Sequence, residues 1–156
     1  MTAALRLLLL TTLLVAHGAD LAAAGRRSPE EAQARVDHHL RQAEPLARHF
    51  HALVAAGCPR LATRTQWEGY LDAEIDRVVL LLAHLGEAWT EARQTGDDDV
   101  RRSAKAPRKQ FQSAAPELLR RLQACAAAHG TTVPMALRAR VEAEVPQRRA
   151  EIALPQ

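Results

Sequence analysis

The stretch from Thr65 to Gly96 constrains the fold of this chain more than any other feature of the sequence. Its apolar residues recur in alternating steps of four and three, at Leu71, Ile75, Val78, Leu82, Leu85, Trp89 and Ala92. This spacing is the a/d pattern of an antiparallel helical bundle or coiled coil. Apolar residues at 79–81 widen the stripe, so this helix needs neighbours on several sides. Thr65 and Glu68 predict a capping box at its start, and Gly96 predicts a left-handed residue at its end.

A first helix precedes this central one. Ser28, Pro29 and Glu31 are residues favoured at the N-cap and at the first and third positions of a helix. Pro45 lies inside the segment and predicts a kink, and Gly57 predicts the end of the helix. Because the linker to the central helix is short, we expect the two helices to run antiparallel.

A third helix is predicted after Gly96. Three acids at 97–99 fit its start, because carboxylates stabilise the positive end of the helix dipole. Its apolar pattern continues to Gly130, but Pro107 and Pro116 interrupt it. These prolines predict a kinked or broken helix, with the break around Pro107.

Residues 131–134 open a shorter fourth helix, which Pro146 is expected to end or bend, leaving a loosely attached tail to Gln156. Hydrophobic residues make up 47% of the chain and aromatic residues 3%, a composition that suits helix packing better than a sheet. We predict an all-α fold in which residues 25–156 form one domain. The domain is an up-down-up-down four-helix bundle with three long helices and a shorter fourth.

The N-terminus has the pattern of a cleaved signal peptide over residues 1–24. Arg6 precedes an apolar run, and small residues allow cleavage after Ala24 or after Ala19. The run is short for a membrane span, although a retained anchor is the alternative. We therefore predict a secreted or periplasmic protein.

The chain has two cysteines, Cys58 and Cys125, and export favours a disulfide between them over two free thiols. The predicted order of the helices places both at the same end of the bundle. A redox-active pair is not indicated, because the cysteines lack the C-x-x-C spacing.

Three histidines carry the possibility of a metal or haem site. His38 and His84 are expected at the same level of an antiparallel helix pair, with His39 beside them. The sequence has no H-E-x-x-H or C-x-x-C-H motif. Ordinary boundary histidines are the favoured interpretation, and no cofactor is predicted.

Glu68, Asp72 and Asp76 form a like-charged stripe on the central helix. Two close carboxylates are able to act as acid and base. Pairing with Arg48 and His49 of the first helix is the favoured interpretation.

One basic cluster contains no acids; its members are Arg101, Arg102, Lys105, Arg108 and Lys109. It is a candidate for contact with an anionic surface, and a solvated helix face is the alternative. The fourth helix adds a second basic run. The sequence lacks the interleaved aromatic residues of single-stranded nucleic-acid binding, so no nucleic acid is predicted.

The sequence has no Gly-rich phosphate loop, dinucleotide fingerprint or nucleophile elbow. We therefore predict a non-enzymatic bundle that binds a partner protein or an anionic envelope component, with possible peripheral membrane contact. A metal- or haem-binding bundle is the alternative, and a small enzyme using the acidic stripe ranks last.

Overall fold

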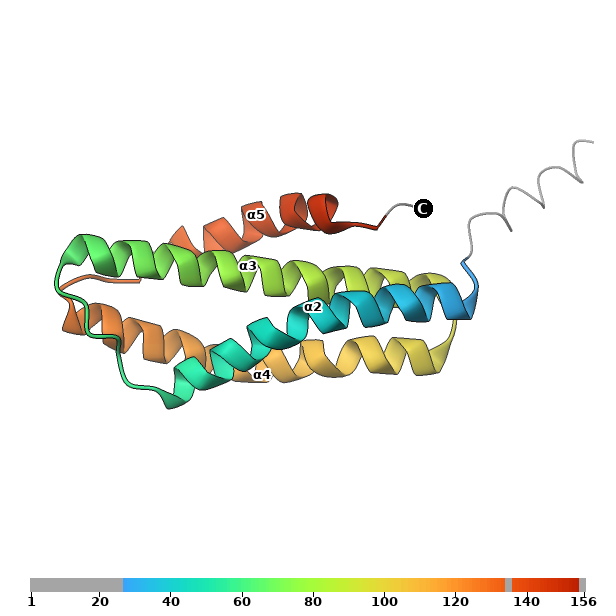
Figure 1. Cartoon of the computed structure of the whole chain (residues 1–156), viewed down its shortest axis with the longest axis horizontal. Helices are drawn as coiled ribbons and strands as arrows, with labels where there is room; N and C mark the ends of the chain where they lie inside the picture. The colour runs from blue at the N-terminus through green and yellow to red at the C-terminus, as the bar shows by residue number, and fades with distance from the viewer. Residues whose placement is uncertain (1–26, 134–135, 155–156) are drawn as a thin grey trace, which may run out of the picture.

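The computed structural model describes residues 27–133 and 136–154. This part of the chain is all-helical, with four helices and no strand: α2 (Pro29–Ala55), α3 (Arg64–Thr95), α4 (Asp98–Ala128) and α5 (Ala136–Ile152). The direction of the chain alternates from each helix to the next (Figure 1). None of the described helices is long and apolar enough to cross a membrane. The segment predicted to be a signal peptide lies outside the described residues.

The helix starts follow the predicted capping chemistry, although one lies at a different residue. The Ser28 hydroxyl accepts from the Glu31 backbone N–H, and the Glu31 carboxylate accepts from the Ser28 N–H, both at 3.2 Å. The prediction for α3 was wrong by two residues. Its N-cap is Thr63, which forms the capping box with Gln66, whereas Thr65 lies inside the helix. Both threonines precede Glu or Gln by three residues, so the motif alone does not separate them.

The prolines interrupt the helices less than predicted. The prediction of a break around Pro107 was wrong, because α4 is continuous through Pro107 and Pro116. Ala104 and Phe111, on either side of Pro107, both pack into the bundle, and this burial outweighs the one hydrogen bond that proline removes. α5 likewise continues past Pro146 to Ile152 instead of ending there.

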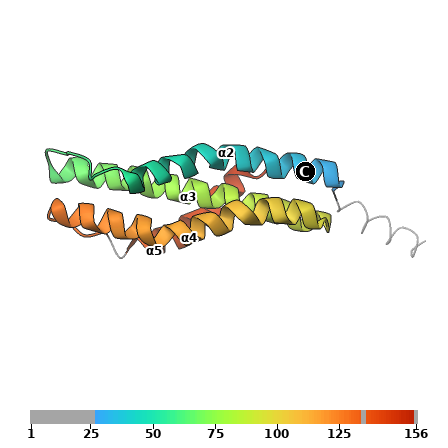
Figure 2. The same ribbon diagram turned by 90° about the horizontal axis from the view of Figure 1, so that it is seen from below.

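α3 lies at the centre, as its broad apolar surface requires. The three long helices run side by side (Figure 2), and α5 lies along another side of α3 than α2 and α4 do (Figure 1). The α3–α5 contact joins Leu71, Ile75 and Val79 to Leu137, Val141 and Val145. Among the described helices, α5 packs only against α3, so it does not sit between α2 and α4 as the fourth member of a closed bundle would.

The two cysteines lie at the same end of the long helices, as predicted. The sulfur atoms of Cys58 and Cys125 are 2.09 Å apart and the Cα atoms 5.3 Å apart, in the geometry of a disulfide. Trp67 lies beside this pair and stacks on His129, with ring centroids 5.0 Å apart. The linker after α2 and the end of α4 are thereby joined.

Candidate binding grooves

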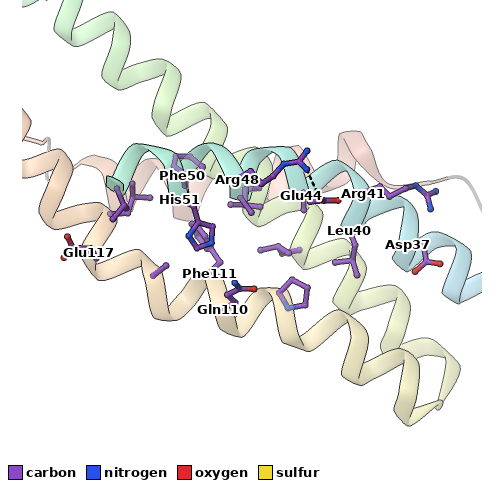
Figure 3. A pocket seen from close by; sticks show the side chains of 18 residues that line it. Asp37, Leu40, Arg41, Glu44, Arg48, Phe50, His51, Gln110, Phe111 and Glu117 are labelled. Atoms are coloured by element: carbon purple, nitrogen blue, oxygen red, sulfur yellow. Dashed lines mark hydrogen bonds and ion pairs between the residues drawn. The ribbon is translucent and has the colours of Figure 1, made fainter. Parts of the chain in front are cut away.

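A mostly apolar groove of about 750 Å³ lies between α2 and α4 and has α3 as its floor (Figure 3). We call it the α2–α4 groove. Its large apolar lining residues are Leu40, Phe50, Leu81, Leu85, Phe111 and Leu118. Polar residues of both helices form its rims, among them Arg41, Glu44 and His51 on α2 and Gln110 and Glu117 on α4. The volume is within the range of ligand-binding clefts in proteins.

The α2–α4 groove is bounded by contacts at both ends. At one end, Val36 of α2 packs with Val100 and Ala104 of α4. At the other end, the Arg121 guanidinium donates to the Val54 carbonyl, with nitrogen–oxygen distances of 3.0 and 3.3 Å. Between these ends, the Phe50 and Phe111 rings lie 6.1 Å apart between centroids, beside a buried cluster to which α2, α3 and α4 all contribute. Packing of α2 against α4 therefore defines both ends of the groove.

Charges on the rims are mostly paired within one helix. Glu44 accepts from Arg48 at 2.9 Å, and Glu117 accepts from Arg120 at 2.8 Å. Both pairs are exposed, so neither contributes much to the stability of the fold. Arg41 has no ion-pair partner among the described residues. The rims therefore offer polar contacts around an apolar floor.

A second groove, of about 570 Å³, lies between α3, α4 and α5. We call it the arginine groove, because Arg93, Arg108 and Arg149 reach it from the three helices in turn. Its other polar lining residues include Thr90 and Gln112. The apolar part of its lining consists mainly of Leu82, Leu85, Trp89, Val141, Val145 and Pro146.

The basic cluster predicted to face an anionic surface lies on α4, and two of its five members are paired with acids of the same helix. Arg101 pairs with Asp98, and Arg102 pairs with Asp99, one helical turn earlier in α4. The other members are exposed: Lys105, Arg108 and Lys109. Of the five, Arg108 alone lines the arginine groove, where it meets arginines that are distant in the sequence.

The structure brings His39 and His84 into contact. Their Nδ1 atoms are 3.2 Å apart, and the His38 ring lies 5.2 Å from the His39 ring between centroids. Burial, followed by the nearby His84, His38 and Arg35, lowers the pKa of His39 to about 4. Burial and His38 also lower the pKa of His84. The described residues contain no group of three or more His, Cys, Asp or Glu side chains able to hold a metal ion.

The acidic stripe of α3 is paired, but not with the predicted partners. The Arg140 guanidinium on α5 donates to Asp72 at 2.9 Å and to Asp76 at 3.0 Å. Glu68 accepts from Arg64 within α3 at 2.8 Å. The stripe therefore helps to fasten α5, which the sequence pattern did not indicate.

The predicted partners of that stripe make other contacts. Arg48 pairs with Glu44 in its own helix. His49 Nε2 lies 2.7 Å from a carboxylate oxygen of Glu74, which is buried and also accepts from Arg77 at 2.7 Å. Burial and Glu74 together raise the pKa of Tyr70 to about 12. The side of α3 that faces α2 therefore carries Glu74, and not the stripe of Glu68, Asp72 and Asp76.

Comparison with known protein families, with curated proteins and with solved structures finds no match. Function is therefore inferred from the lining of the two grooves. The α2–α4 groove is apolar with polar rims. The arginine groove combines positive charge with apolar surface. These compositions suit different ligands.

Proposed function

We propose that this protein is an exported, non-enzymatic helical-bundle module that binds an amphipathic helix of a partner protein in the α2–α4 groove. The observation that carries the proposal is the open apolar groove between α2 and α4, with α5 packed on another side of α3. A helix seated there and antiparallel to α2 and α4 would complete four-helix packing.

The length of the α2–α4 groove matches that of such a helix. Its lining on α2 runs from Asp37 to Val54, a span of 18 residues or roughly 27 Å of helix. Apolar residues at i, i+3, i+4 and i+7 of the partner would meet the groove floor. Its polar residues would meet rim groups such as Arg41 and Gln110.

Export is part of the proposal, with residues 1–24 as the signal peptide. The paired cysteines support it, because disulfides persist in oxidising compartments. N-terminal sequencing of the secreted or periplasmic protein should begin at Gly25, or at Asp20 if cleavage follows Ala19. Recovery of a chain that still begins with Met1 from the membrane fraction would contradict export.

Site-specific photo-crosslinking in the native host tests the helix-binding proposal. A photoreactive residue is placed at Ala114, which lines the groove, or at Ser113, which is exposed on the same helix outside it. We expect Ala114 to crosslink to one protein through a peptide with an amphipathic helical pattern, and Ser113 not to. Equal crosslinking from both positions, or an adduct formed only with lipid or with a second copy of this chain, would contradict the proposal.

A charge placed in the groove provides a second readout. Ala47 lines the groove, whereas Ala52 is exposed on the same helix outside it. We expect Ala47→Glu to lower the Ala114 crosslink by about tenfold, since a charge must be desolvated there, and Ala52→Glu to leave it unchanged. Circular dichroism of both variants controls for loss of folding.

A further inference from the structure

We propose that the arginine groove binds an anionic amphiphile, with its phosphate or carboxylate head group at Arg93 and Arg108 and its apolar part between α3 and α5. This site is separate from the α2–α4 groove, so its test does not depend on the proposed partner helix.

The positive charge of the arginine groove is only partly neutralised. Arg93 and Arg108 are exposed, and neither forms an ion pair or hydrogen bond with another described side chain. Glu142 is the one carboxylate among the described lining residues, and it accepts from Arg138. Guanidinium groups on two helices can each donate to one oxyanion, and such charge-assisted hydrogen bonds are the strong ones.

Arg149 is fixed in place beside these two arginines. Its Nε donates to Glu87 at 2.7 Å and its Nη2 donates to Thr90 at 2.6 Å. Its side chain also lies against Gly86, where an added Cβ would come within 3.1 Å of Arg149 Cδ and Nε. The absence of a side chain at Gly86 therefore lets Arg149 lie close to α3 and form one wall of the groove.

The apolar lining decides the class of ligand. Leu82 and Trp89 of α3 face the groove together with Val141 and Val145 of α5, and all four are half-buried. An inorganic anion would leave this surface in water, whereas an acyl chain would cover it. Each methylene of such a chain that the groove removes from water strengthens binding. A head group attached to an acyl chain therefore fits both halves of the groove.

Binding of dodecyl phosphate, kept below its micelle-forming concentration, tests the proposal through tryptophan fluorescence. Trp89 lines the groove, whereas Trp67 is buried beside the disulfide. We expect a saturable fluorescence change that Trp89→Phe removes. We expect weaker binding of inorganic phosphate and of the uncharged dodecyl maltoside, since each supplies one half of the ligand.

The basic cluster itself supplies a matched control. We expect Arg93→Gln with Arg108→Gln to weaken binding of dodecyl phosphate by about tenfold or more. Arg102→Gln with Lys109→Gln removes the same charge outside the groove and should change binding by less than about twofold, because exposed charges at a distance are screened by salt. Gly86→Ala should weaken binding several-fold by displacing Arg149.

Three results would overturn the proposal. The first is an equal loss of binding in the two double variants, which would show a general surface effect. The second is inorganic phosphate or dodecyl maltoside binding as tightly as dodecyl phosphate. The third is the absence of a saturable change that depends on Trp89.

Discussion

The two ends of the long helices are held together in different ways. At the small-residue end, the buried cluster consists of Val36, Ala88, Ala92, Val100 and Ala104. At the cysteine end, the buried cluster consists of Trp67, Cys125 and Ala126, with Leu61, Tyr70 and Val133 packed against it. One end thus relies on close approach of helices, and the other on a large aromatic residue and a covalent link.

The difference follows from the path of α2. At the small-residue end, three alanines allow the helix backbones to approach closely. The C-terminal half of α2 slopes away from α3 (Figure 1), and Pro45 lies inside the helix where the predicted kink would fall. The disulfide joins the linker after α2 to α4 at this end of the helices.

The largest predicted effect is loss of the disulfide. Cys58 and Cys125 are 67 residues apart in the sequence, and closing a loop of that size stabilises a fold by about 4 kcal/mol in the chain-entropy model. We expect Cys58→Ser and Cys125→Ser each to lower the free energy of unfolding by about 2–4 kcal/mol. Chemical denaturation of the mature protein measures it.

The double cysteine variant provides the control. Because one bond is lost in every case, the double variant should be no less stable than the weaker single variant. Two reactive thiols in the denatured, unreduced parent protein would show that the bond does not form and would remove this explanation of the cysteine end.

A second prediction tests how closely the helices pack at the small-residue end. Ala88 is fully buried in the cluster with Val36 and Val100. Ala88→Leu inserts a branched side chain into a closely packed interface and should lower the free energy of unfolding by about 1–3 kcal/mol. Ala106→Leu, at an exposed position of α4, is the matched control and should change it by less than about 0.5 kcal/mol. Equal stability of the two variants would show that this end is not closely packed.

The helices were predictable from local signals, but their arrangement was only partly so. Ser28 and Glu31 place the start of α2, and Gly96 ends α3, because capping depends on residues within one turn. The continuity of α4 at Pro107 depends on burial by other helices, which a local rule does not include. The side of α3 that α5 covers is likewise a tertiary choice.

The candidate sites show the same limit. Ala43 and Phe50 of α2 are buried in the core, but the α2–α4 groove beside them depends on which side of α3 is covered by α5. Arg93, Arg108 and Arg149 come from three helices, and no sequence motif links them. The sequence predicted the histidine cluster more closely, because the antiparallel register of two helices places His84 near His38 and His39.

A third prediction concerns the histidine pair formed by His39 of α2 and His84 of α3. The pKa of His39 is about 4 in the folded protein, and the ordinary value is 6.5. Between these values the unfolded chain binds a proton that the folded protein does not, so stability is lost as pH falls from 6.5 to 4 and levels off below 4. One pKa unit corresponds to about 1.4 kcal/mol, and relaxation around the charged ring reduces the total, so we expect a loss of the order of 1–2 kcal/mol.

His39→Gln isolates this contribution. Because the variant lacks the titrating ring, its free energy of unfolding should fall less steeply between pH 6.5 and pH 5 than that of the parent. Denaturation curves at half-unit pH intervals measure the two slopes. Identical slopes would show that His39 does not carry the acid sensitivity of the α2–α3 interface.

The smallest predicted effect comes from a comparison of the two ion-pair contacts that attach α5 to α3, one toward each end of the bundle. Arg140 contacts Asp72 and Asp76 toward the cysteine end, and those aspartates are 70% and 60% exposed. Arg149 contacts Glu87 toward the other end, where the Glu87 side chain is 11% exposed. Arg140→Gln should therefore lower the free energy of unfolding by less than about 1 kcal/mol. Arg149→Gln should lower it more, because it leaves a buried carboxylate without its ionic partner. Thermal unfolding of both variants in low and high salt tests this order, and a greater loss in Arg140→Gln would show that the exposed contact is the stronger attachment of α5.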